Sequence, residues 1–285
     1  MCGFTKPMLA VLLATLLLCG SVPALAADAN DGKGKTVQAQ VVLTVAESKR
    51  LIAKAVAQMP IVRDALNNGM IIVAKGTTNT YVAEELLGET IAHGAYVYGR
   101  TYPTKGGKIL EPAESVAEVV LIKGELQRNL PLAEAVQQLK PGDVVIKGAN
   151  ALDYQNRTAG VLIGSSSGGT SGKIMPYVVG SKVHLVIPVG LEKQVCGNVV
   201  DIANMMREPV ESLNDIPSMF LLTGHIMTEI EAVESLAGVA VFQAAAGGIG
   251  GAEGAVRLVC RGTKKQVENA LKLVEQIQGE PPFIR

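Results

Sequence analysis

A strand, a polar glycine loop and a helix follow one another in the segment between Ile71 and Leu86. Residues 71–74 are apolar, Lys75-Gly76-Thr77-Thr78-Asn79 is polar, and a helical pattern then continues to Leu86. The first turn of a helix presents unpaired N–H groups and a positive dipole end, which attract an anion. Glycine allows close backbone approach, and the threonines and Asn79 could cap the helix or donate to an anion oxygen. The segment indicates an α/β fold with an anion site, although an ordinary strand-to-helix turn also fits these residues.

Two further glycine loops follow apolar strands. One consists of Lys147, Gly148, Ala149 and Asn150, and the other contains Ser166, Ser167, Gly168, Gly169 and Thr170 and leads to Lys173. The carboxyl ends of parallel strands lie at one edge of a sheet, where α/β proteins bind ligands. We therefore expect the three loops to form one pocket for a small phosphorylated or carboxylated metabolite. Lys193, which follows a strand ending at Val189, could face the same pocket, although surface positions would also suit these lysines.

Apolar strands alternate with short helices along most of the chain. This alternation predicts a mostly parallel, Rossmann-like sheet with helices on both faces over residues 44–215. Two strands, at 96–98 and 116–122, predict an antiparallel excursion at the sheet edge. Residues 216–285 follow a β-α-β-β-α order, which predicts a small ferredoxin-like α+β domain. Residues 27–43 are expected to be a flexible leader, because their first part is polar and rich in glycine.

The first 26 residues have the pattern of a signal peptide. Lys6 precedes an apolar run from Met8 to Cys19, and Ala24-Leu25-Ala26 matches a small-x-small cleavage site. The run is shorter than the ~20 residues that cross a bilayer. We expect export to the periplasm or the extracellular space after cleavage near Ala26, without stable membrane insertion afterwards. An uncleaved anchor and a lipoprotein modified at Cys19 are the alternatives.

Composition and charge argue against several classes of partner. The chain has 26 basic and 26 acidic side chains, so no basic surplus points to nucleic acid. Only 18% of residues are charged and 48% are apolar, which fits a sheet covered on both faces. No motif indicates a cofactor, and His93, His184 and His225 lack metal-ligand spacing. Cys196 and Cys260 could form a disulfide after export or remain buried free thiols.

The order of the three loops resembles that of ribose-5-phosphate isomerase A and its superfamily, which includes glucosamine-6-phosphate deaminases and coenzyme A transferases. Gly76-Thr77-Thr78 is similar to the Gly-(Ser/Thr)-Thr loop of the isomerases, and Glu192-Lys193-Gln194-Val195 is similar to their Ser-Lys-Gln-Val segment. The turn 148–151 also resembles LUD domains of the same superfamily. The resemblance covers about residues 44 to 200 and implies a phosphate pocket, with a small α+β lid formed by about the last 70 residues.

The carboxylates that the resemblance would assign to catalysis are not matched. Moving a proton between neighbouring carbons of an aldose requires a base. The places of the family's acidic residues are taken by Lys147, Asn150, Ala151 and Gly172, none of which can act as a carboxylate base. We therefore expect an exported protein that binds an anionic metabolite and lacks ribose-5-phosphate isomerase activity.

Two other functions remain open from the sequence. The chain could be an enzyme with altered chemistry that uses Asp153 or Glu253 together with a lysine, although a solvated loop and a hairpin tip would also explain these two residues. It could instead have a structural role in which the C-terminal unit makes a homo-oligomer contact. Tyr96, Tyr98 and Tyr102 could line a ligand or partner surface, but packing in the core or at a strand edge is the commoner use of such residues.

Overall fold

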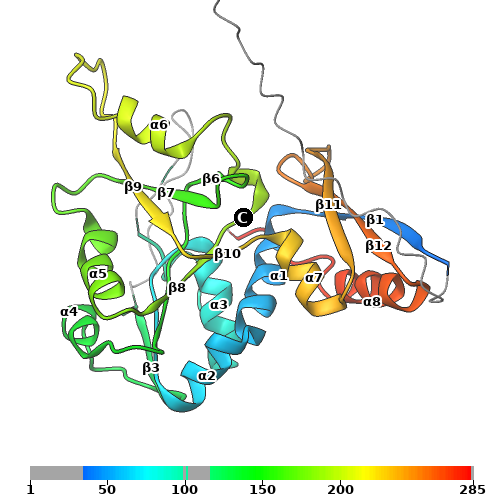
Figure 1. Ribbon diagram of the computed structural model, residues 1–285, viewed down its shortest axis with the longest axis horizontal. Coiled ribbons are helices and arrows are strands. Elements are labelled where there is room, and N and C mark those ends of the chain that lie inside the picture. The colour runs from blue at the N-terminus through cyan, green and yellow to red at the C-terminus, as the bar shows by residue number, and fades with distance from the viewer. Residues whose placement is uncertain (1–34, 99–100, 102–115, 284–285) are drawn as a thin grey trace, which may run out of the picture. The chain divides into compact units, whose positions relative to one another are not determined.

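The computed structural model describes residues 35–98, 101 and 116–283 of the chain (Figure 1). The expected signal peptide, the first part of the expected leader and Tyr102 lie outside these ranges. No helix within them is long and apolar enough to cross a membrane.

A six-stranded sheet forms the centre of the fold. Its strand order is β10-β8-β5-β2-β3-β4. The first four strands are mutually parallel, β3 is antiparallel to β2, and β4 is antiparallel to β3. The bounds are β2 Met70–Val73, β3 Val119–Ile122, β4 Glu125–Leu126, β5 Val144–Ile146, β8 His184–Pro188 and β10 His225–Met227. Every residue of β2 and β5 is buried, as expected for parallel strands covered on both faces. The predicted mixed α/β fold and its mostly parallel sheet are confirmed. Of the two strands expected to form an antiparallel edge, only the second is found among the described residues, as β3.

Helices lie on either side of this sheet in Figure 1, with α1, α2 and α3 on one side and α4 and α5 on the other. Their bounds are α1 Val45–Gln58, α2 Pro60–Asn68, α3 Thr77–Leu87, α4 Leu132–Ala135 and α5 Gly169–Gly180. Thr44 and Glu47 form a capping box at the start of α1. The remaining short helices are η1 Val136–Gln138, η2 Leu191–Lys193 and α6 Val199–Met205.

A separate antiparallel sheet has the order β6-β7-β9, with bounds β6 Ala151–Asp153, β7 Thr158–Ile163 and β9 Ser218–Thr223. The sequence analysis assigned the β7 segment to the parallel sheet. Only four residues join β6 to β7, which allows an antiparallel hairpin, whereas a parallel pair needs a crossover of a dozen residues or more. The strand expected to open the C-terminal domain, β9, also pairs with β7.

The third sheet pairs a strand near the start of the described chain with two strands near its end. Its order is β1-β12-β11, all antiparallel, with bounds β1 Val37–Leu43, β11 Ala240–Ala246 and β12 Val256–Gly262. The helices α7 Glu229–Ala237 and α8 Lys264–Glu275 pack against it. Residues 37–43 were expected in a flexible leader, but Val41 and Leu43 are core residues. Because β1 replaces β9 as the third strand, the predicted ferredoxin-like unit is not confirmed.

The segment 96–98, predicted as a strand, has no strand pairing. Tyr96 is fully buried, and its hydroxyl donates to the carbonyl of Val73 and accepts the N–H of Val119 at 2.8 Å. The tyrosine is therefore a core residue between β2 and β3. Cys196 is exposed and Cys260 is buried in β12, and both are free thiols.

Candidate functional site

A cavity of about 1270 Å³ is lined by residues from all three predicted loops. The predicted residues that line it are Lys75, Gly76, Thr77, Thr78, Asn79, Lys147, Gly148, Ala149, Asn150, Ser167, Gly169, Thr170, Lys173 and Lys193. Ser166 and Gly168 belong to the third loop but do not line the cavity. Segments that are about 100 residues apart in the sequence thus line the same cavity.

The three loops do not come from one sheet edge, as the sequence analysis expected. The first two follow β2 and β5, which are parallel neighbours in the six-stranded sheet. The third follows β7, which belongs to the antiparallel sheet, and leads into α5. The cavity is therefore lined by loops from two sheets.

The first turn of α3 faces the cavity without a side-chain cap. Its N-cap residue is Gly76, and no side chain there bonds to the N–H groups of the first turn. Thr80 donates its hydroxyl to the Gly76 carbonyl at 3.0 Å. Thr78 is only 2% exposed, yet its hydroxyl has no hydrogen-bond partner among the described residues. This turn therefore keeps both backbone and hydroxyl donors available.

Asn79 holds two strand ends together. Its amide nitrogen donates to the carbonyls of Ala74 at 2.7 Å and Ile146 at 3.2 Å, at the ends of β2 and β5. Its oxygen has no partner among the described residues, and a Cβ placed on Gly148 would lie 3.5 Å from it. The sequence analysis gave Asn79 the role of a cap or an anion donor. Since its donor group is used by the backbone, Asn79 instead positions the first two loops against each other.

The first turn of α5 has the same arrangement. Gly168 is its N-cap residue with φ +80°, a left-handed conformation that favours glycine, and no side chain caps the helix. Ser171 is 1% exposed, and its hydroxyl also lacks a partner in the described part of the chain. A Cβ placed on Gly172 would lie 2.0 Å from the Ser167 carbonyl oxygen, so the loop packs directly on the helix.

The charges around the cavity are mainly positive. Four lysines line it, whereas Glu118 is the one carboxylate among the described lining residues; the lysines are Lys75, Lys147, Lys173 and Lys193. The ammonium group of Lys75 lies 4.3 Å from the centre of the Tyr98 ring. Burial lowers the pKa of Lys147 to about 8, and the positive charge of Lys193 acts in the same direction. The site is electropositive and includes an amine that readily loses its proton.

A buried group of charges adjoins Lys193. Burial lowers the pKa of Lys193, while the carboxylates Glu192 and Glu229 oppose this shift. Lys49 forms an ion pair with Glu192 at 3.4 Å. Glu229 accepts the Leu191 N–H at 2.9 Å, and burial together with Glu192 raises the pKa of Glu229 to about 7.

We expect the Glu229→Gln variant to lack part of the pH dependence of stability. The folded state keeps the Glu229 proton up to about pH 7, whereas the unfolded chain releases it near pH 4.5. The folded state therefore binds more protons in this window, and the wild-type free energy of unfolding falls as the pH rises through it. As the pH rises from 4.5 to 7, the free energy of unfolding of the variant should increase by up to ~3 kcal/mol relative to that of the wild type. Urea unfolding measures this difference. Exposed Glu268→Gln is the control, and parallel curves for wild type and Glu229→Gln would contradict the expectation.

The two carboxylates proposed for catalysis do not line the cavity. Asp153 accepts the backbone N–H and the side-chain amide of Asn156 at 3.0 and 2.9 Å. Burial opposes the shift, but these hydrogen bonds lower the pKa of Asp153. Glu253 lies in the loop between β11 and β12, where it accepts the Gly251 N–H at 3.0 Å. Neither residue is placed to act with the cavity lysines.

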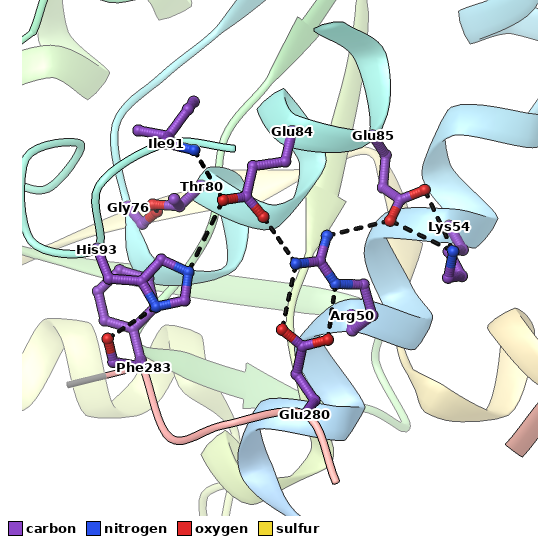
Figure 2. Close-up of polar contacts among 10 residues, drawn as sticks. All are labelled: Arg50, Lys54, Gly76, Thr80, Glu84, Glu85, Ile91, His93, Glu280 and Phe283. Carbon is purple, nitrogen blue, oxygen red and sulfur yellow. Dashed lines mark hydrogen bonds and ion pairs between the residues drawn. The ribbon is translucent and has the colours of Figure 1, made fainter. Parts of the chain in front are cut away.

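The sequence analysis missed the C-terminal contribution to the cavity. Phe283 lines it and stacks on His93, with ring centres 4.5 Å apart and planes 10° apart. The Nδ1 of His93 donates to the Phe283 carbonyl at 2.9 Å (Figure 2). No sequence signal joins two residues that are 190 positions apart. The cavity is also lined by Pro282 and by Tyr98. For Tyr98, a place on a ligand surface was one of the two predicted alternatives.

Arg50 fixes the segment that carries Phe283. It binds Glu84 at 2.7 Å, Glu85 at 3.0 Å and Glu280 at 3.0 Å, so one guanidinium connects α1, α3 and the C-terminal segment (Figure 2). Burial alone would lower the pKa of Arg50, but the hydrogen bonds that its guanidinium donates to Glu280 and Glu84 raise it above its ordinary value. This ion-pair cluster supports one wall of the cavity from outside.

Comparisons with protein-family models, curated proteins and solved structures give no match to this chain. In the described ranges, no three His, Cys, Asp or Glu side chains are grouped closely enough to hold a metal ion.

Proposed function

We propose that this cavity binds a small metabolite through a phosphate or carboxylate group. The observation that carries the proposal is a pair of buried hydroxyls, of Thr78 and Ser171, that have no hydrogen-bond partner within the described ranges. Each lies in the first turn of an uncapped helix at the same cavity. A buried hydroxyl without a partner costs ~1–3 kcal/mol. The oxygens of an anion bound at these helix turns would accept from the free N–H groups and, once the side chains turn toward the cavity, from the two hydroxyls, which would remove this cost.

The charges around the cavity favour an anion over a neutral ligand. Lysines from all three loops line it, and each could form a charge-assisted hydrogen bond to phosphate or carboxylate. The cavity is large enough for a phosphorylated sugar, since ligand sites usually occupy ~300–1,000 Å³.

We also propose a distant relationship to the ribose-5-phosphate isomerase superfamily, without the isomerase reaction. The succession of β2, glycine loop and α3 beside β5 and its glycine turn supports this relationship. Against the reaction, Lys147, Asn150 and Gly172 stand where the family has carboxylates, so the base that the proton shift needs has no counterpart in the loops.

A thermal-shift panel with paired variants tests the proposed binding. Inorganic phosphate, glycerol 3-phosphate, ribose 5-phosphate, lactate and coenzyme A are the probes, and at least one should raise the Tm of the wild type. Thr78→Val and Ser171→Ala should each weaken binding of that probe roughly tenfold or more, because one hydrogen bond to a charged group is lost. In the absence of the probe both variants should be as stable as the wild type or slightly more stable.

Thr80→Val is the matched control on α3. The Thr80 hydroxyl already donates to the Gly76 carbonyl. Its loss should therefore lower the free energy of unfolding but leave the affinity for the probe unchanged. Ribose 5-phosphate should remain unconverted by NMR. No stabilisation by any probe, or equal affinity for the wild type and for both hydroxyl variants, would overturn the proposal.

A further inference from the structure

Lys147 differs from the other lysines of the cavity in its surroundings. It follows β5 directly, and its backbone N–H donates to the Val186 carbonyl at 3.0 Å, which fixes the residue at the strand end. The residue is 9% exposed and lines the cavity. Its amine donates to the Gly148 carbonyl at 3.2 Å, and it forms no ion pair with any carboxylate in the described residues.

Lys173 and Lys193 have different surroundings. Lys173 is exposed on α5. Burial lowers the pKa of Lys193 as well, but the carboxylates Glu192 and Glu229 oppose this shift. Lys147 is instead influenced by the positive charge of Lys193, which together with burial brings its pKa to about 8. About half of the Lys147 amines would be uncharged at pH 8.

We propose that Lys147 forms an imine with the carbonyl carbon of an anionic aldehyde or ketone held in this cavity. The inference rests on the proposed function, because the phosphate or carboxylate of the ligand anchors it at the first turns of α3 and α5. A buried amine beside an anion site is the arrangement that Schiff-base lysines require. The substrate class is thus narrowed from anionic metabolites to those with a reactive carbonyl.

The step balances without an added oxidant or reductant. The lone pair of the uncharged Lys147 amine attacks the carbonyl carbon, and the C=O π electrons move to oxygen. A proton passes from nitrogen to that oxygen to give a carbinolamine. The C–O bond then breaks as the nitrogen lone pair forms the C=N bond, and the departing hydroxyl takes up the second proton that nitrogen gives up, so one water molecule leaves.

Reductive trapping tests this proposal on the full-length chain. Pyridoxal 5′-phosphate, which carries both an aldehyde and a phosphate, is incubated with the protein, and sodium cyanoborohydride then reduces any imine to a stable secondary amine. Mass spectrometry should show one adduct per chain, and peptide mapping should place it on Lys147. The rate of labelling should rise through about pH 8, following the pKa of this amine. Excess inorganic phosphate should suppress the adduct, and benzaldehyde, which lacks the anion, should give no selective adduct.

Matched variants locate the reacting amine. Lys147→Arg keeps a positive charge but has no nucleophilic amine, and Lys147→Met removes a buried charge without an ion-pair partner, so both should fold and lose the adduct. Lys265→Arg, which changes an exposed lysine of α8 that does not line the cavity, should keep it. An adduct on Lys193, or labelling spread over surface lysines, would overturn the assignment to Lys147.

Failure of this inference can be told apart from failure of the proposed function. If glycerol 3-phosphate, which has no carbonyl, raises the Tm of the wild type but no adduct forms on Lys147, the imine is excluded and anion binding stands. If glycerol 3-phosphate and inorganic phosphate leave the Tm unchanged and no phosphate-sensitive adduct forms, both proposals fall.

Discussion

Replacing Arg50 with alanine is expected to lower the free energy of unfolding by ~3 kcal/mol or more. The side chain is 16% exposed and is the shared partner of Glu84, Glu85 and Glu280. Its removal leaves three carboxylates close together, and Glu84, whose side chain is 6% exposed, loses its shortest ion pair. Urea unfolding measures the loss. The same variant should weaken binding of the anion probe, since Phe283 is carried by the segment that Glu280 ties down.

Lys54→Ala is the matched control for this prediction. Lys54 lies on the same helix, is 37% exposed and binds only one of these carboxylates, Glu85, at 3.5 Å. An exposed pair of this kind contributes under ~1 kcal/mol. If Lys54→Ala and Arg50→Ala destabilise the protein equally, the guanidinium does not organise the cluster as described.

Local signals in the sequence predicted much of the secondary structure. The capping box of Thr44 and Glu47 marks the start of α1, and Gly88, in the left-handed conformation, ends α3. Such signals lie within one helical turn of the feature that they specify. For the same reason the apolar runs of β2 and β5 could be recognised as buried strands of a parallel sheet.

Pairing between distant segments could not be predicted in the same way. Strand β1 lies beside β12, and Val37 is paired with Gly262. The alternation of more and less buried residues along β1 shows that one face of the strand is covered, but it does not identify the strand with which β1 pairs. The same limit explains why β7 and β9 were assigned to the wrong sheets and why Phe283 was missed as part of the cavity.

The candidate site could be predicted to the level of its loops but not of its atoms. Three glycine loops were expected to lie together, and they line one cavity. The use of each polar atom depends on neighbours from other segments: the Asn79 amide is occupied by the Ala74 and Ile146 carbonyls, whereas the Thr78 hydroxyl has no partner in the described chain. Residue types and spacing indicate an anion loop, but only the packed structure shows which donors are free.

Replacing Gly172 with alanine is expected to weaken binding of the anion probe at least tenfold. The added Cβ would lie 2.0 Å from the carbonyl oxygen of Ser167, a distance that no packed Cβ atom tolerates. The contact is with backbone rather than a flexible side chain, so the third loop must move away from α5. The Ser171 hydroxyl and the first N–H groups of α5 would then no longer face the position set by the first two loops. A loss of ~1–3 kcal/mol in unfolding free energy should accompany the change.

Gly180→Ala, at the other end of α5, separates this effect from a general change in the helix. Apart from the adjoining residues and the helix's own backbone, no described atom lies within 4 Å of a Cβ placed on Gly180. Alanine there should therefore leave binding unchanged and stabilise the helix by up to ~1 kcal/mol. Isothermal titration with the probe found by thermal shift compares the two variants directly. If Gly172→Ala binds as tightly as Gly180→Ala, the third loop is not part of the anion site, because its displacement would then have no effect on the ligand. A loss confined to Gly172→Ala would mean that the antiparallel sheet, through β7 and its loop, contributes to a site otherwise built at the edge of the parallel sheet.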